Sequence, residues 1–249
     1  MPGTLPLLMD GDEFRVKILV AGAQKAGTTS LFGYFCDHPE LLPPMRKESH
    51  FFDDEAIDWS APDYSVLHRM YEPRDYKRQA FDITPIYLFW PPSLARIRDY
   101  NSTIKLILLF RDPIERAWSH WRMEYGRNAE DLPFHVAIRQ GRWRLKGLAP
   151  LHTAWRVYSY VERGFYARQV RKVFDLFPQE NVLLLRSNDL KRHHQATLGL
   201  IADFAGLSPF PSLSPRLDHR GAPAEHRLRV EDVGYLRQLF CDDIGRAHV

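Results

Sequence analysis

A short glycine-bounded segment near the N-terminus has the residue types of a phosphate-binding loop. Residues 22–29 read GAQKAGTT and lie between an apolar run, residues 16–22, and a stretch with apolar residues at helical spacing, residues 28–37. Small residues let a phosphate approach the backbone, unpaired N–H groups at the start of a helix attract anions, and threonine hydroxyls donate hydrogen bonds. The segment therefore predicts a strand, an anion-binding loop and a helix in succession.

The two glycines of this loop have the spacing of a Walker A motif, but its lysine is displaced. A lysine should follow the second glycine, whereas Thr28 stands there and Lys25 comes three residues earlier. The departure counts against an ATPase or a GTPase and favours a related cradle with different chemistry. The alternative is an ordinary strand-to-helix turn with an exposed lysine.

A second candidate anion site follows the most apolar strand pattern of the chain. Arg111 comes directly after that pattern, and Ser119 lies eight residues later on a predicted helix. Ligands bind beyond the carboxyl ends of parallel strands, so we expect Arg111 and Lys25 to face one crevice. Arginine suits phosphate oxygens, and a nucleotide with phosphates at its 5′ and 3′ positions needs two such clamps. The alternative is that Arg111 pairs with Asp112 or Glu115 and that Ser119 faces a neighbouring helix.

The elements that must position these residues alternate between strands and helices. Apolar runs predict strands at 16–22, 79–83, 104–110 and 181–186, and helical spacing predicts helices at 28–37, 114–125, 151–177, 189–205 and 230–244. Residues 41–59 and 132–150 are predicted loops. This order predicts an α/β fold with a central parallel sheet flanked by helices and a P-loop-like nucleotide-binding core. We expect a single domain, 1–249, in which residues 1–14 are a flexible segment.

Composition is that of a folded protein of ordinary charge. The 249 residues suffice for one sizeable core, and a net charge of +3 suits a locally held anion better than a nucleic-acid track. Of the two cysteines, Cys36 has apolar neighbours that predict a buried thiol, and no residues have metal-ligand spacing. The N-terminus lacks signal-peptide features and no apolar run reaches membrane-spanning length, so we expect a cytoplasmic protein.

Taken together, these segments resemble the sulfotransferases that use 3′-phosphoadenosine 5′-phosphosulfate (PAPS), particularly the branch of the heparan sulfate sulfotransferases and their bacterial relatives. The resemblance rests on the order and spacing of six stretches, of which the first and fourth are specific and the others supporting. The stretches are 24–29 (QKAGTT), 47–53 (KESHFFD), 82–87 (DITPIY), 109–119 (LFRDPIERAWS), 163–166 (RGFY) and 182–190 (VLLLRSNDL).

The resemblance implies transfer of a sulfuryl group from PAPS to a hydroxyl or amine of a carbohydrate or small-metabolite acceptor, without a metal. It implies that Glu48 is the catalytic base and that Lys25 stabilises charge on the departing phosphate. Arg111 and Ser119 would hold the 3′-phosphate of PAPS and of its product PAP (3′-phosphoadenosine 5′-phosphate). The 5′-phosphosulfate would be bound by Lys25, Ala26, Gly27, Thr28, Thr29 and Ser30.

Two departures from the family pattern stand out. The family often has a lysine where this chain has Ile83, so any substrate contact from that lysine is lost or supplied elsewhere, with Lys47 as a candidate. The family's late nucleotide loop is only approximated by residues 219–223 (HRGAP), in which Arg220 and Gly221 are assigned to the cofactor. An exposed, proline-flanked basic loop is the alternative for that segment.

Other side chains have more than one interpretation. His50 and His120 are rivals of Glu48 as the base, and Glu48 itself could be a solvated side chain in a charged loop. A basic stretch could receive an anionic acceptor or form a solvated face, and we favour the solvated face. That stretch contains Arg139, Arg142, Arg144 and Lys146.

Two other classes of function compete with the sulfotransferase. A P-loop kinase of small metabolites would share the opening strand, loop and helix, but it needs a lysine after the second glycine and a magnesium-binding carboxylate. A nucleic-acid-binding protein is suggested only by the basic isoelectric point and by scattered arginines, and we rank it last. The sequence specifies neither the acceptor nor the oligomeric state.

Overall fold

The computed structural model describes residues 14–71, 74–216 and 227–246, and a five-stranded sheet runs through its centre. The strand order is β2-β3-β1-β4-β5, and every neighbouring pair is parallel, which confirms the predicted α/β architecture. Residues 41–42, which were predicted as part of a loop, form a short edge strand. The strands are β1 (Ile18–Gly22), β2 (Leu41–Leu42), β3 (Gln79–Ile83), β4 (Lys105–Phe110) and β5 (Val182–Arg186).

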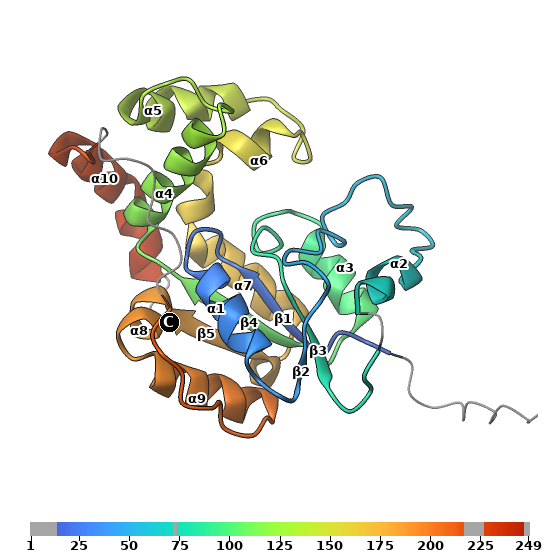
Figure 1. Cartoon of the computed structure of the whole chain (residues 1–249). Helices are drawn as coiled ribbons and strands as arrows, with labels where there is room; N and C mark the ends of the chain where they lie inside the picture. The colour runs from blue at the N-terminus through green and yellow to red at the C-terminus, as the bar shows by residue number, and fades with distance from the viewer. Residues whose placement is uncertain (1–13, 72–73, 217–226, 247–249) are drawn as a thin grey trace, which may run out of the picture.

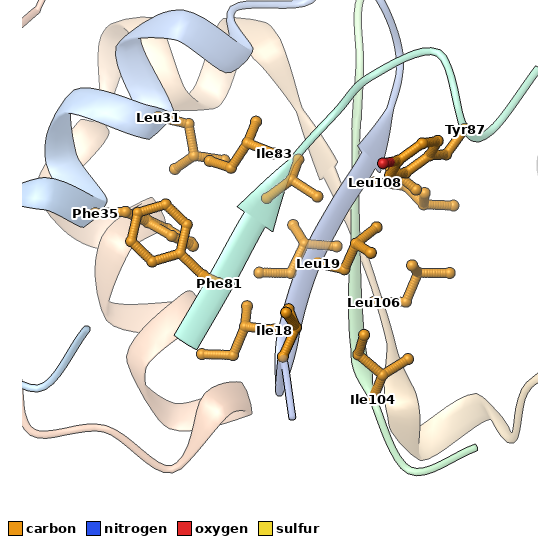
Figure 2. Packing of buried hydrophobic residues seen from close by; sticks show 14 of the residues in the cluster. Ile18, Leu19, Leu31, Phe35, Phe81, Ile83, Tyr87, Ile104, Leu106 and Leu108 are labelled. Carbon is orange, nitrogen blue, oxygen red and sulfur yellow. The ribbon is translucent and has the colours of Figure 1, made fainter. Parts of the chain in front are cut away.

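The central strands are apolar throughout because helices cover both faces of the sheet. All five residues of β1 and the four inner residues of β4 are buried. Figure 2 shows Leu31 and Phe35 of α1 (Thr28–Cys36) packed against Phe81 and Ile83 of β3, with Leu108 of β4 on the other side of the sheet. The core therefore fixes the strand ends from which the candidate site residues project.

Two pairs of helices cover the sheet (Figure 1). On one face α1 lies beside α9 (His194–Ala205), and the ring of Tyr34 stacks on that of His194 with centroids 5.9 Å apart. On the opposite face α3 (Ser93–Tyr100) contacts α7 (Tyr166–Leu176). Short elements complete this part of the chain: α2 (Ser65–His68), η1 (Arg69–Tyr71), η3 (Gln179–Asn181) and α8 (Ser187–Arg192).

The remaining helices form a lobe beyond the end of the sheet at which β1 and β4 terminate (Figure 1). This helical lobe has its own apolar cluster, which includes buried Trp121 and Phe240. The Asp112 carboxylate caps the first helix of the lobe by accepting from the N–H groups of Ile114 and Glu115, both at 2.9 Å. The lobe contains α4 (Pro113–Gly126), α5 (Phe134–Leu145), α6 (Ala154–Tyr158), η2 (Glu162–Gly164) and α10 (Val230–Arg246).

The helical lobe is also where the sequence predictions were wrong. Residues 132–150 were predicted as a loop, but they contain α5, because Phe134, Ala137, Ile138 and Leu145 are buried at helical spacing. The intervening arginines and lysine hid this pattern. Residues 151–177 were predicted as one helix, but they form α6, η2 and α7, and the chain breaks at Ser159, whose hydroxyl donates to the Trp155 carbonyl oxygen at 2.5 Å.

Three smaller expectations concern the chain ends and the cysteines. Cys36 is exposed rather than buried, because it is the last residue of α1 and lies on its outward side. Residues 1–13 of the segment predicted to be flexible lie outside the described residues, whereas Phe14 is buried against the rings of His68 and Tyr71. Among the helices that the structure describes, none combines the length and apolarity needed to cross a membrane.

Substitution of Gly22 by alanine should destabilise the protein. A Cβ at this position would lie 2.6 Å from Cβ of Leu88, which is held close because its N–H donates to the Ala21 carbonyl at 2.8 Å. Relief of this overlap requires a backbone shift, for which we expect a loss of about 1–3 kcal/mol in the free energy of unfolding, measured by urea denaturation. The matched control is Gly199→Ala, where a Cβ meets nothing within 4 Å, and which should be neutral or slightly stabilising. Equal stability of the two variants would contradict the packing argument.

Candidate functional site

The loop that joins β1 to α1, residues 22–30, has the geometry of an anion-binding loop. Lys25 and Gly27 have φ angles of 71° and 99°, and the left-handed region favours glycine at the second position. Gly27 is the N-cap residue of α1, and no side chain caps this terminus. The first N–H groups of the helix are therefore available to an external anion. We call residues 22–30 the anion loop.

Lys25 projects from the anion loop toward the helical lobe. Its Nζ lies 3.5 Å from Sδ of Met123 on α4. Burial lowers the pKa of the lysine, and the nearby guanidinium of Arg127 lowers it further, while the Glu124 carboxylate opposes them. A cation so placed has shed part of its hydration and can interact strongly with an anion bound at the loop.

Arg111 and the anion loop lie side by side, as expected from the strand order. Nη1 of Arg111 donates to the Lys25 carbonyl oxygen at 3.3 Å, and the Tyr166 hydroxyl donates to the Arg111 carbonyl at 3.0 Å. The pairing with an acidic neighbour that the sequence offered as an alternative is also present, because Nε and Nη2 of Arg111 donate to Glu115 at 3.0 and 2.9 Å. That ion pair is largely exposed and contributes little, so Arg111 is free to exchange it for a phosphate.

The other predicted phosphate ligands are less directly connected. Ser119 lies on α4, the helix that follows Arg111, and is partly exposed. Arg220 and Gly221 lie outside the described residues. The structure therefore brings Lys25 and Arg111 into contact and leaves the other assignments as predictions.

Glu48 lies next to the anion loop although 18 residues separate Thr29 from Lys47. The ammonium of Lys47 bridges the two, since it donates to Thr29 Oγ1 at 3.0 Å and to Glu48 Oε1 at 2.7 Å. Glu48 and His50 have φ angles of 64° and 54°, which are costly for residues with side chains. Such backbone strain persists only where surrounding contacts hold it.

Those contacts come from the DITPIY segment, for which the sequence suggested no role beyond resemblance. The Ser49 N–H donates to Thr84 Oγ1 at 3.0 Å, and the Ser49 hydroxyl donates to Asp82 Oδ2 at 2.6 Å. The Tyr87 hydroxyl lies 2.8 Å from Ser49 Oγ. Asp82 is fully buried, and burial raises the pKa of its carboxyl. The segment therefore anchors the loop that carries Glu48. Ile83, which replaces the family's lysine, is buried and contributes no charge.

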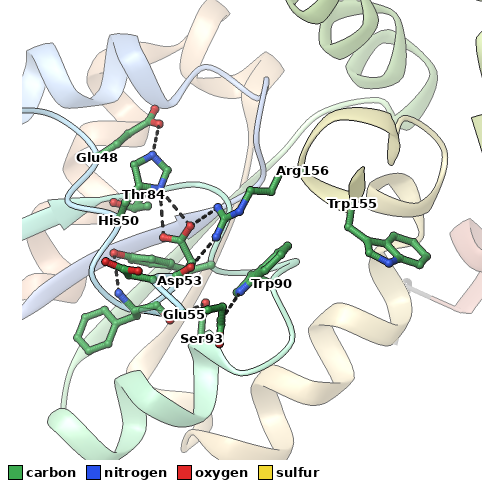
Figure 3. Close-up of polar contacts among 12 residues, drawn as sticks. Glu48, His50, Asp53, Glu55, Thr84, Trp90, Ser93, Trp155 and Arg156 are labelled. Atoms are coloured by element: carbon green, nitrogen blue, oxygen red, sulfur yellow. Dashed lines mark hydrogen bonds and ion pairs between the residues drawn. The ribbon is translucent and has the colours of Figure 1, made fainter. Parts of the chain in front are cut away.

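A chain of alternating charges continues from Glu48 (Figure 3). His50 Nε2 lies 3.4 Å from Glu48 Oε2, and His50 Nδ1 lies 3.1 Å from Asp53 Oδ1. Asp53 is buried and also forms an ion pair with Arg156. Figure 3 shows these residues as one connected chain of contacts, which turns at Asp53 and ends at Arg156 of α6. The sequence suggested a role for His50 but not for Asp53 or Arg156, because Arg156 reaches Asp53 across 103 residues of sequence.

The charge states along this chain follow from the same contacts. Burial alone would raise the pKa of Glu48, but hydrogen bonds from His50 and Lys47 outweigh it and lower the pKa to about 2. Hydrogen bonds to Asp53 and then Glu48 raise the pKa of His50 to about 9. At neutral pH, Glu48 is therefore a carboxylate and His50 is a cation. Of the two, only Glu48 can accept a proton.

His120, the other rival base, is unsuited to the role. The side chain is fully buried, and burial together with the nearby Arg163 lowers the pKa well below its usual value. Its ring packs edge-on against Tyr160, with centroids 4.9 Å apart. His120 is therefore a neutral residue of the helical lobe with no access to a substrate.

Arg163 belongs to the RGFY stretch, and the sequence predicted no role of its own for this residue. It is almost fully buried and donates to the Gln24 side chain of the anion loop. It also donates to Ser159 Oγ at 2.7 Å and to the Arg156 carbonyl at 2.9 Å. Burial, followed by repulsion from Arg116, lowers the pKa of Arg163 to about 9. The RGFY stretch of the family resemblance is the sequence signal that points to it.

A cavity of about 500 Å³ opens beside His50. Asp53, Trp90 and Arg156 contribute to its wall, so it lies between the loop that carries Glu48 and α6. We call it the Asp53 pocket. It is large enough for a small molecule or one end of a longer one. Among the described residues, no group of three histidine, cysteine or acidic side chains is placed to hold a metal ion.

Comparison with known proteins identifies the family. The human heparan sulfate glucosamine 3-O-sulfotransferase 3A1 is 29% identical over 211 residues, which are 83% of this chain and 48% of that protein. The mouse heparan sulfate glucosamine 3-O-sulfotransferase 6 is 29% identical over 193 residues, 76% of this chain and 52% of that protein. The chain thus spans about half the length of these curated relatives.

Solved structures support the fold. A sulfotransferase from Alicyclobacillus acidocaldarius superposes with a TM-score of 0.76 at 23% identity, covering 94% of each chain. The sulfotransferase domain from the curacin biosynthetic pathway gives 0.55 at 16% identity, covering 92% of this chain and 99% of that one. The sulfotransferase domain family itself matches residues 15–213. Because that match extends over most of the 249 residues and includes the anion loop, Glu48 and Arg111, the chain belongs to the sulfotransferase family.

Proposed function

We propose that this protein transfers a sulfuryl group from PAPS to a hydroxyl, or an amine, of a carbohydrate or small-metabolite acceptor. The observation that carries the proposal is the Lys47 ammonium, which touches both Thr29 of the anion loop and the Glu48 carboxylate. A donor held at the loop and a base held at Glu48 would therefore meet at one point. Family membership supports the same chemistry.

The donor has two anionic ends, and the site offers two cationic regions to match them. Residues 25–30 would bind the 5′-phosphosulfate through the open N–H groups of α1, the threonine hydroxyls and Lys25. Arg111, with Ser119 on the next helix, would bind the 3′-phosphate. The contact from Arg111 to the Lys25 carbonyl keeps the two regions adjacent, as one nucleotide requires. Arg220 and Gly221 remain proposed ligands.

The acceptor would approach from the Asp53 pocket. His50, which contacts Glu48, lines this pocket. The acceptor's oxygen or nitrogen forms a bond to sulfur as the bond from sulfur to the bridging phosphate oxygen breaks. Glu48 takes the acceptor's proton, and Lys25 stabilises the negative charge that develops on the departing phosphate. In-line transfer of this kind depends mainly on position and charge neutralisation, both of which these residues supply.

The kinase alternative is not favoured. Thr28, the first residue of α1, stands where a P-loop kinase needs its lysine, and the chain matches the sulfotransferase family. We further propose that residues 1–249 form one domain and that no nucleic acid takes part in the reaction. We also propose that the protein acts in the cytoplasm, which cell fractionation can test.

Replacement of Glu48 by glutamine should abolish turnover without loss of the nucleotide. Removal of a general base costs about 10²–10⁴-fold in kcat. The Kd for PAP should stay within about twofold, because Glu48 reaches a proposed phosphate ligand, Thr29, only through Lys47. Turnover with an identified acceptor and titration calorimetry with PAP measure the two effects. The control is Glu180→Gln, an exposed residue of η3. Full activity of the Glu48 variant would refute the base assignment.

Replacement of Lys47 by methionine should shift the acid limb of the pH–rate profile. Lys47 lowers the pKa of Glu48, so its loss raises that pKa, and activity that requires ionised Glu48 should disappear at higher pH than in the wild type. Lys47→Arg should restore the wild-type limb in part, because it keeps the charge. An unchanged acid limb in Lys47→Met would show that Glu48 ionisation does not limit the rate.

Replacement of Arg111 by alanine should weaken PAP binding selectively. We expect a loss of about tenfold or more for PAP, but little change for 5′-AMP, which lacks the 3′-phosphate. The matched control is Arg186→Ala, since Arg186 also ends a strand and pairs with a nearby acid, Asp189 at 2.9 Å. Equal losses for the two nucleotides would place Arg111 elsewhere than at the 3′-phosphate.

A further inference from the structure

The guanidinium of Arg163 connects separate segments of the candidate site, and each of its three nitrogens donates a hydrogen bond. Nη1 donates to the side-chain oxygen of Gln24 in the anion loop, and Nε donates to Ser159 Oγ at 2.7 Å. Nη2 donates to two carbonyl oxygens of α6, that of Trp155 at 3.1 Å and that of Arg156 at 2.9 Å. The Arg163 side chain is only 2% exposed, so these bonds take the place of its hydration.

The two carbonyl groups belong to the end of a short helix. The last four carbonyls of a helix have no N–H partner within it, and α6 has only five residues. A guanidinium that donates to two of these carbonyls therefore fixes the end of α6. Arg163 thereby orients Arg156, whose own guanidinium pairs with Asp53 in the chain of contacts that leads through His50 to Glu48 (Figure 3).

A third segment lies against the same guanidinium. The Phe89 ring centroid is 4.9 Å from the Arg163 guanidinium carbon, a distance at which the face of the ring attracts a cation. Phe89 follows the 82–87 segment, in which Asp82 accepts from the Ser49 hydroxyl and so anchors the loop that carries Glu48. Arg163 therefore contacts the donor side of the site through Gln24 and the base side through α6 and Phe89.

A buried cation is costly unless hydrogen bonds replace its hydration, and no carboxylate of the described residues forms an ion pair with Arg163. Arg116, which is also buried in the helical lobe, provides a comparison. Its Nη2 donates to the Tyr160 carbonyl, but Nε and Nη1 have no hydrogen-bond partner in the described part of the chain. The complete set of bonds at Arg163 is therefore specific to its place between the two sides of the site, and is not shared by every buried arginine of the lobe.

We infer that Arg163 is a positioning residue, which holds the anion loop and the loop that carries Glu48 in a fixed relation to each other. Its bond to Gln24 restrains the next residue, Lys25, whose φ angle of 71° is costly for a residue with a side chain and needs contacts to hold it. Arg163 acts through Gln24 and Arg156 and takes no part in the bond changes. The inference rests on the proposed function for its effect on the rate, but its effect on the anion loop does not.

The first test separates turnover from nucleotide binding. Gln24→Met keeps the length of a partly exposed side chain and removes the oxygen that accepts from Arg163. We expect kcat to fall about tenfold or more, because Lys25 is no longer held in place at the departing phosphate. The Kd for PAP should stay within about threefold, because the N–H groups of α1 still bind the phosphate. Arg163→Lys keeps the charge but loses the fork of donors, so we expect the same division between kcat and Kd.

The double variant shows whether Gln24 and Arg163 act through one bond. Combined with Arg163→Lys, Gln24→Met should lower kcat no further than Arg163→Lys alone, since the bond is already lost. Independent, additive losses would contradict the inference. The matched control is Gln195→Met, because the Gln195 side chain also accepts a hydrogen bond, from the Leu213 N–H at 3.4 Å, but belongs to α9, which carries no proposed site residue. It should leave kcat unchanged.

A second test needs no turnover. Hydrogen exchange of the full chain without nucleotide should become faster over residues 22–30 in both single variants, and faster over residues 154–159 only in Arg163→Lys, because α6 keeps its bonds to Arg163 in Gln24→Met.

The two tests separate failure of the inference from failure of the proposed function. A wild-type protein that transfers no sulfuryl group, with the expected changes in exchange, would support the positioning role and count only against the proposed function. Unchanged exchange over residues 22–30 in both variants would overturn the inference. So would an active wild type whose kcat survives Gln24→Met, or a loss in that variant that lies in PAP binding alone.

Discussion

The carboxyl ends of β1, β3 and β4 meet at one edge of a parallel sheet, and the candidate site depends on that edge. β1 lies between the other two strands, so the anion loop that follows it has neighbours on both sides. On one side stands Arg111, and on the other stands the Asp82–Tyr87 segment that anchors the loop with Glu48. An antiparallel arrangement would send these ends to opposite edges and separate the groups that need to act together.

Charge alternation then fixes the protonation states at this edge. From Lys47 through Glu48, His50 and Asp53 to Arg156, each charged group contacts one of opposite sign. Hydrogen bonds between these groups favour the ionised forms and outweigh the effect of burial, so the pKa of Glu48 falls and that of His50 rises. A carboxylate with so low a pKa is a weak base.

A buried cation, Arg163, links the helical lobe to the anion loop that follows β1. Arg163 is removed from water almost entirely, and hydrogen bonds to Ser159, backbone carbonyls and Gln24 offset the desolvation. Its bond to Gln24 makes the position of the anion loop depend on the lobe. The lobe in turn positions α6, whose Arg156 lines the Asp53 pocket.

Sequence alone determined the elements whose pattern is local. Three kinds of signal act within a few residues: the apolar runs of β1 and β4, the glycine that caps α1, and Pro113 at the start of α4. The strand–loop–helix units could therefore be predicted with their ends nearly correct. Tertiary structure decided the rest. α5 is a helix because its apolar face packs in the lobe with α4 and α10, and Arg163 meets Gln24 across 139 residues of sequence. Lys47 joins Thr29 to Glu48 only because the fold places their loops together, since side-chain contacts between distant segments leave no periodic trace in the chain.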